Sequence, residues 1–283
     1  MNAPSGRRSA VVTMGLCMAA GAVGLVALHD GAAKAAVPSL LAPEAKSLEE
    51  LTVRLGRAPR RRDFKTVPMI LNEPDQWDHA ALSEVISYRG APKQVWDNTG
   101  IASQWLNVMR NSLNTQVWSF RHPDFLVVSA THGTALLALP KPAIWEKHQL
   151  ARLTGGKFQT NTLIADQSGA GADPKDYENP QGVYSAHDNS IPALQRRGVV
   201  FLACHNAIWE FAETLITAEV NPDKFSHEAL AAELSNGLVA GVVLTPGIVG
   251  TLAELQGSGF SYATSGRQHS RRTPLRTLSV RKR

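Results

Sequence analysis

The chain has 283 residues, of which 43% are hydrophobic and 19% charged, so it is long enough to bury one sizeable core. This composition excludes a collagen, a coiled coil and a chain that is disordered throughout. The formal charge of +5 resides at the ends: residues 265–283 contribute +7, residues 1–35 contribute +2, and the body, 36–264, carries −4. We therefore expect no nucleic-acid partner for the body.

Residues 1–35 have the pattern of an export signal. Arg7 and Arg8 precede an uncharged run over 9–28, and small residues follow around Ala35. These are the charged, apolar and cleavage-site regions of a signal peptide, and the paired arginines resemble a twin-arginine signal. An uncleaved N-terminal anchor is the alternative. We expect a periplasmic protein that is cleaved near Ala35 and keeps no stable membrane anchor.

The sequence contains two cysteines. Cys17 lies within the apolar part of the signal and would be removed with it, which leaves Cys204 as the thiol of the mature chain. Cysteines of exported proteins usually occur in disulfide pairs. An unpaired cysteine is therefore a candidate reactive group.

Residues 36–92 predict a helical N-terminal extension. Ser47 and Glu50 are spaced as a capping box for a short helix that ends near residue 55, and Asp78 is spaced to cap a second helix over 79–88. The basic loop APRRRDF between them is expected to be solvated or to dock through salt bridges. Anion binding by its arginines is the alternative.

From residue 93 onward, short apolar runs alternate with segments of helical periodicity. The predicted strands are KQVW at 93–96, FLVVSA at 125–130, GVVFLA at 198–203, GLVAGVVL at 237–244 and FSYAT at 260–264. Helices are predicted after the first, third and fourth of these strands, and over 226–234. Such alternation is typical of parallel βαβ units. We predict an α/β domain over 93–264, built on an open parallel sheet flanked by helices.

Two further segments lack a regular pattern. Residues 154–190 are rich in Gly, Pro and Asp, and they predict a flexible loop that borders the site. Residues 265–283 predict a basic, disordered tail, for which attachment to nucleic acid or anionic lipid is the alternative.

Polar and titratable residues follow the predicted strands. The carboxyl ends of parallel strands meet at one edge of a sheet, where open α/β folds bind ligands, so we expect these residues to form one rim. They are Asp97, Asn98, Thr131, His132, Cys204, His205, Asn206 and Thr245.

Within this rim Cys204 is the predicted nucleophile. At the start of a helix, free N–H groups and the positive end of the helix dipole favour a thiolate. His132 or His205 would add positive charge or relay a proton, and Asp97 would orient one of them. The predicted substrate-binding groups are Asn98, Asn206 and Thr245.

Two other interpretations are open from the residues alone. Free cysteine is among the most buried residue types, so Cys204 could equally be the last core residue of its strand. A mononuclear metal site at Cys204 with His132 or His205 is the second alternative. One cysteine with scattered histidines lacks the usual ligand spacing, so we predict neither a metal nor a cofactor.

Several segments resemble the DsrE/DsrF-like sulfur-relay proteins. The C-terminal half of that family is similar to GVVFLACHNAIWEFAETLI followed by GLVAGVVLTPGIVGTLAELQGSGFSYA: a strand ends in a cysteine, a short helix follows, and a later strand leads to a Leu-rich helix and an aromatic end. The first strand, helix and second strand resemble KQVWDN, MRNSLNTQ and FLVVSATHGTALLAL. The likeness covers roughly 93–264 and is weak over 140–190.

The resemblance implies a small flavodoxin-like domain that forms trimers or hexamers, in which Cys204 carries sulfur as a persulfide. The export signal, the N-terminal extension, the long loop and the basic tail depart from the family. Family members act in the cytoplasm with dedicated partners, whereas this chain is expected to be exported. The resemblance therefore does not identify its sulfur donor or acceptor, which could be a protein or a small molecule. We expect a sulfane-sulfur carrier or sulfurtransferase-like protein. The alternative is a non-catalytic module that binds a small ligand or partner, with Cys204 buried.

Overall fold

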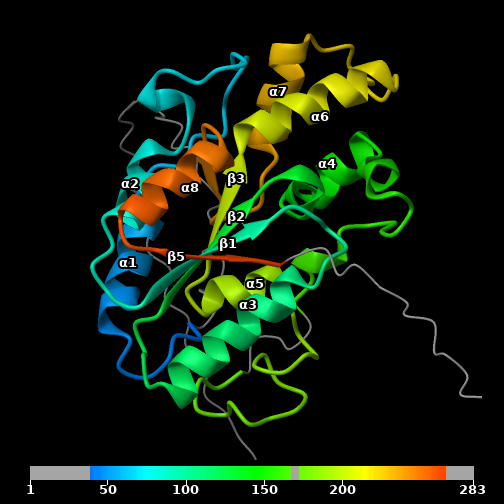
Figure 1. Cartoon of the computed structure of the whole chain (residues 1–283). Coiled ribbons are helices and arrows are strands. Elements are labelled where there is room, and N and C mark those ends of the chain that lie inside the picture. The colour runs from blue at the N-terminus through cyan, green and yellow to red at the C-terminus, as the bar shows by residue number, and fades with distance from the viewer. Residues whose placement is uncertain (1–38, 167–171, 266–283) are drawn as a thin grey trace, which may run out of the picture. The chain divides into compact units, whose positions relative to one another are not determined.

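The computed structural model describes residues 39–166 and 172–265 (Figure 1). The predicted signal peptide and most of the predicted basic tail lie outside these ranges, as do five residues of the predicted loop.

Five parallel strands form one sheet in the order β4-β3-β2-β1-β5. They are β1 (Lys93–Asn98), β2 (Leu126–Thr131), β3 (Val200–Cys204), β4 (Val243–Thr245) and β5 (Ser261–Thr264). The predicted α/β class with an open parallel sheet is confirmed. The strand order places the topological switch point between β1 and β5, whereas the flavodoxin order 2-1-3-4-5 places it between the first and third strands.

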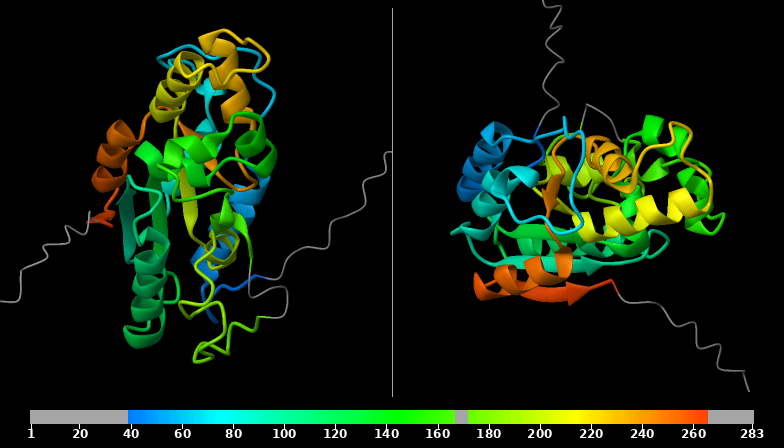
Figure 2. Two further views of the ribbon diagram at one scale, coloured as in Figure 1. Left: turned by 90° about the vertical axis from the view of Figure 1, so that its right-hand side faces the viewer. Right: turned by 90° about the horizontal axis from the view of Figure 1, so that it is seen from above.

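Helices cover both faces of this sheet. Helices α3 (Trp105–Asn114) and α5 (Ile191–Arg196) lie on one face, and α8 (Ile248–Gly257) lies on the other (Figure 1). The remaining helices are α1 (Lys46–Arg57), α2 (His79–Ile86), α4 (Pro142–Lys147), α6 (His205–Thr217) and α7 (His227–Asn236). Figure 2 shows β5 at the outer border of the sheet, while the inner strands β2 and β3 are buried at every residue.

The N-terminal extension docks on β4 through a buried carboxylate. Asp78 accepts hydrogen bonds from the Arg62 guanidinium at 3.0 and 2.9 Å and from the Leu244 N–H at 2.7 Å. The Asp78 side chain has no exposed surface. The predicted docking of the basic loop through salt bridges is therefore confirmed, and the extension shares one hydrophobic core with the sheet.

Of the two predicted helix caps in the extension, Ser47 is wrong, whereas Asp78 is the N-cap residue of α2 without a side-chain cap. Helix α1 begins at Lys46 after Ala45, so Ser47 lies inside its first turn. Asp78 does precede α2, but its side chain caps no helical N–H because the carboxylate is already bound by Arg62 and Leu244.

Two predicted strand boundaries are also wrong. Strand β1 continues through Asp97 and Asn98, since it pairs with β2 on one side and β5 on the other. Of the apolar run 237–244, only the end joins the sheet. Gly241 adopts a φ of 82°, a left-handed conformation that turns the chain, so β4 begins at Val243.

Candidate functional site

The predicted rim residues do gather at the carboxyl edge of the sheet. The register pairs Asn98 with Thr131, Thr131 with Ala203, and Cys204 with Thr245. The same register brings the residues that follow β2 and β3 to neighbouring positions, which places His132 beside Cys204 along the edge. The side chains, however, divide between the two faces.

Asn98 faces α3 and belongs to the core. Its Nδ2 donates to Ser129 Oγ at 2.9 Å and contacts the Met109 sulfur at 3.6 Å, and the residue is fully buried. Ser129 Oγ lies 2.8 Å from Thr131 Oγ1. Asn98 and Thr131 are thus members of a buried polar network on one face of the sheet, away from Cys204.

Asp97 and His132 form a pair at the switch point. His132 Nε2 lies 2.7 Å from Asp97 Oδ1, and the Tyr262 hydroxyl of β5 lies 2.7 Å from Asp97 Oδ2. The side chains of Asp97 and His132 are about one fifth exposed. An ionised carboxylate only accepts, so this network assigns the proton of neutral His132 to Nε2 and leaves Nδ1 with a free lone pair. Of the two histidines that Asp97 was predicted to orient, His132 is the one that it contacts.

Tyr262 is the member of this cluster that sequence reasoning missed. Its hydrogen bond to Asp97 raises the pKa of the phenol, so the hydroxyl stays protonated and continues to donate. The alternating pattern of FSYAT predicts that Tyr262 lies in a strand and points to one of its two faces. It does not predict that this strand pairs with β1, which is what brings Tyr262 to Asp97.

Cys204 ends β3 and immediately precedes α6. Its Sγ accepts a hydrogen bond from the backbone N–H of Ile248, the first residue of α8, at 3.3 Å. The residue is 4% exposed and packs in the main core. The sulfur thus contacts the N-terminus of α8, and its residue directly precedes α6.

His205 does not share the Cys204 environment as predicted. It is fully buried, and its Nε2 lies 2.8 Å from the carbonyl oxygen of Pro68 in the N-terminal extension. Burial lowers the pKa of this imidazole, an effect that hydrogen bonds to the backbone at Pro68 and Met69 partly oppose. A neutral His205 therefore fixes the extension to α6.

Asn206 and Thr245 differ in exposure. Thr245 pairs with Cys204 in the sheet, and Asn206 follows Cys204 by two residues. Asn206 is exposed, and its Nδ2 lies so close to Gly247 that a Cβ added there would be 2.8 Å away. Thr245 is fully buried, and its Oγ1 donates to the Ala203 carbonyl at 3.0 Å. Asn206 is thus placed to contact a molecule at this edge, whereas Thr245 stabilises the pairing of β3 and β4.

Within the described ranges, no three or more His, Cys, Asp or Glu side chains gather closely enough to hold a metal ion. Nor is any helix of those ranges long and apolar enough to cross a membrane. Comparison with protein-family models, with curated proteins and with solved structures found no match.

Proposed function

We propose that Cys204 carries sulfane sulfur as a persulfide, as the resemblance to DsrE/DsrF-like proteins implies. The observation that supports this most directly is the hydrogen bond from the Ile248 N–H to Sγ at a strand end. A backbone donor at a helix N-terminus favours the thiolate, which is the nucleophilic form of cysteine.

The transfer needs no oxidant or reductant beyond the sulfur donor. The Cys204 thiolate attacks the outer sulfur of a small persulfide or polysulfide and forms a new S–S bond. The S–S bond of the donor breaks, and its electron pair leaves with the shortened donor as a thiolate. Passing the sulfur to an acceptor thiolate is the reverse of this step.

His132 is the proposed base that takes the proton of Cys204. Its Nε2 is held by Asp97, so Nδ1 is free to accept, and the strand register sets the two residues side by side. His132 and Cys204 are not hydrogen-bonded to each other within the described residues, so the proton would move when a donor or a water molecule bridges them.

The burial of Cys204 restricts the donor. At 4% exposure the sulfur is reached by a small molecule such as polysulfide more readily than by the cysteine of a folded protein. Asn206 lies exposed beside Gly247, next to the Ile248 donor, and displacement of its side chain would widen this approach.

The deciding experiment is mass spectrometry of the intact mature protein after incubation with polysulfide. We expect an added mass of one sulfur atom, about 32 Da, that dithiothreitol removes and that Cys204→Ser lacks. His132→Gln should slow loading without preventing it. No adduct on the wild type, or an equal adduct on Cys204→Ser, would refute the proposal.

The second candidate is a non-catalytic module that binds a small ligand at the switch point. It is favoured by the partly exposed cluster of Asp97, His132 and Tyr262, together with the burial of Cys204. This candidate predicts that iodoacetamide modifies Cys204 rapidly in urea and at least about a hundredfold more slowly in the native protein. Fast native alkylation would count against it.

The proposal includes export and self-assembly. Export to the periplasm with cleavage near Ala35 is supported by the charged and apolar regions of residues 1–35, and N-terminal sequencing of the secreted protein tests it. A trimer or hexamer is supported by the family resemblance, and light scattering on the mature protein tests it.

A further inference from the structure

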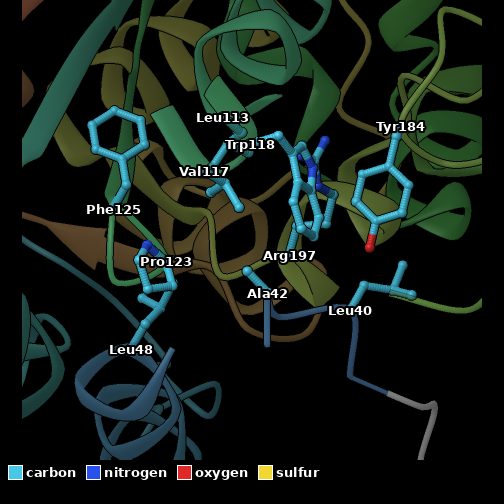
Figure 3. Close-up of a pocket in the computed structure, with 10 residues that line it drawn as sticks. All are labelled: Leu40, Ala42, Leu48, Leu113, Val117, Trp118, Pro123, Phe125, Tyr184 and Arg197. Atoms are coloured by element: carbon cyan, nitrogen blue, oxygen red, sulfur yellow. The ribbon is translucent and has the colours of Figure 1, made fainter. Parts of the chain in front are cut away.

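A pocket lies at the opposite, amino edge of the sheet. It is formed where the N-terminal extension and the long loop meet the end of α3 and the starts of β2 and β3 (Figure 3). Its enclosed part measures only about 10 Å³, and the wider space of about 280 Å³ around it includes open solvent. The lining residues are Leu40, Ala42, Leu48, Leu113, Val117, Trp118, Pro123, Phe125, Tyr184 and Arg197. Seven of the ten are aliphatic side chains, proline or phenylalanine, so the pocket suits an apolar body.

Arg197 brings a positive charge into this apolar setting. The residue is 5% exposed, its Nη2 donates to Asn114 Oδ1 at 2.7 Å, and its guanidinium lies over the Tyr184 ring at 4.6 Å. Nη1 is buried without a hydrogen-bond partner, and no salt bridge to Arg197 occurs in the described part of the chain. Burial lowers the pKa of Arg197 to about 10, so the group is charged at neutral pH. A buried cation without a counterion is costly.

Two further donors in the pocket lack an acceptor. The Tyr184 hydroxyl and the Trp118 Nε1–H are both buried without partners, and Tyr184 is only 5% exposed. The two rings contact edge-on with centroids 6.1 Å apart (Figure 3). An indole N–H and a guanidinium can only donate, whereas a phenol hydroxyl can also accept. In the described chain neither Arg197 Nη1 nor the Trp118 N–H is hydrogen-bonded to the Tyr184 oxygen, and none of the three groups has another partner.

The backbone that carries Trp118 is itself unusual. Residues Thr115–Ser119 form η2, one turn of π-helix that continues α3. Such turns are rare and occur frequently at functional sites, because they reorient the side chains that follow. Val117 and Trp118 both lie on this turn and both line the pocket.

A second guanidinium reinforces the positive potential. Arg110 is 6% exposed, and its Nη2 donates to the side-chain oxygens of Asn107 and Asn111 at 2.7 and 2.8 Å. Those partners are neutral amides, and Arg110 Nε and Nη1 are buried without partners. Its charge contributes to the lowered pKa of Arg197.

We propose that this pocket binds the carboxylate of a small apolar acid, with Arg197 Nη1, the Tyr184 hydroxyl and the Trp118 N–H as its donors. One free guanidinium nitrogen and two neutral donors match a monoanion, since Nη2 is already taken by Asn114. A sulfate or phosphate dianion would need more charge and a wider opening among polar residues. The site is independent of Cys204 and of the proposed sulfur chemistry.

Isothermal titration of the mature protein with sodium propionate at constant ionic strength tests this site. Propionamide is the matched neutral ligand, and sulfate is the control anion. We expect saturable binding of propionate and none of propionamide or sulfate. Tyr184→Phe keeps the ring and removes one donor to a charged group, so the Kd should rise at least about tenfold. Arg197→Met should abolish binding, and Val53→Ala, on the exposed side of α1, should leave it unchanged.

Tyr184→Phe keeps the test decisive if Arg197→Met fails to fold. Equal binding of propionate and propionamide would overturn the carboxylate assignment, and tighter binding of sulfate would overturn the ligand class. An absence of saturable binding, or binding that both variants leave unchanged, would overturn the site itself.

Discussion

Asp97 at the carboxyl edge of the sheet and Arg197 at the amino edge are both charged groups in largely buried surroundings, but they differ in their partners. Asp97 accepts from His132 and Tyr262, whereas Arg197 donates to a neutral amide, lies over the Tyr184 ring and leaves one nitrogen without an acceptor. The Asp97 network is satisfied by the chain itself, whereas the buried donors around Arg197 are not, and a buried donor without an acceptor calls for an explanation.

His205 sharpens this contrast because it too has a buried nitrogen, Nδ1, without a partner. An imidazole can lose its proton and become neutral, and the lowered pKa of His205 reflects that response. A guanidinium does not have this option at neutral pH. Arg197 therefore keeps its charge at neutral pH, whereas His205 is neutral there, and only Arg197 gives a reason to propose an anionic ligand.

The largest effect is expected at the most completely paired charge, Asp78. Asp78→Ala would leave the Arg62 guanidinium and the Leu244 N–H without their acceptor. Breaking a buried ion pair from one side costs about 3–5 kcal/mol of unfolding free energy. Urea denaturation of the wild-type and variant proteins measures this cost. A loss below about 1 kcal/mol would show that the extension is not held by this pair.

At the amino edge we expect the opposite change, a substitution that raises the free energy of unfolding. In the absence of a carboxylate ligand, Arg197→Met replaces an uncompensated buried charge by an apolar side chain of similar length. We expect the unfolding free energy to rise by about 1–2 kcal/mol, because the gain in desolvation exceeds the lost bond to Asn114. The same urea series measures it. A clear destabilisation would mean that Arg197 is satisfied within the protein.

The third prediction concerns pH. Unfolded His205 takes up a proton near its ordinary pKa of 6.5, while the folded residue resists protonation because its pKa is lowered. The unfolded state thus binds more protons below about pH 6.5, and stability falls as the pH falls through this window, by at most about 1.4 kcal/mol per pH unit. Denaturation at pH 7 and pH 5 should show a larger loss for the wild type than for His205→Gln. Equal losses would contradict it.

The smallest effect is expected at the partly exposed cluster. Asp97→Asn replaces an acceptor of two hydrogen bonds by a group that accepts one, at a cost of about 1 kcal/mol. Tyr262→Phe removes a hydroxyl from a residue that is 47% exposed and should cost less than about 0.5 kcal/mol. Thermal denaturation of both variants measures these losses. A larger loss for Tyr262→Phe would make Tyr262, not Asp97, the centre of the cluster.

The strand-end rule predicted the carboxyl edge because it depends only on the order of strands and on their parallel direction. It placed Asp97, His132 and Cys204 at one edge, as the register shows. It could not separate the two faces, so Asn98 was grouped with residues from which it points away. Tyr262 was missed because the position of β5 beside β1 follows from tertiary packing.

The amino edge was beyond prediction for a different reason. Arg197 follows a short helix, Tyr184 lies in the Gly/Pro-rich segment and Trp118 lies on a π-turn, and no spacing in the sequence relates them. They meet because the extension and the loop pack against the same end of the sheet. Unpartnered donors become visible only once every hydrogen bond has been assigned.

The π-turn at Thr115–Ser119 has a consequence for how this pocket would change between related chains. A π-turn holds one residue more than the α-helical turn it replaces, so deleting a single residue there would restore a regular helix. Every side chain after the deletion would rotate by about 100° around the helix axis, and the indole of Trp118 would leave the pocket. Among homologues, gain or loss of the proposed carboxylate site would then follow a one-residue length difference, while the carboxyl edge of the sheet, with Cys204, stayed intact.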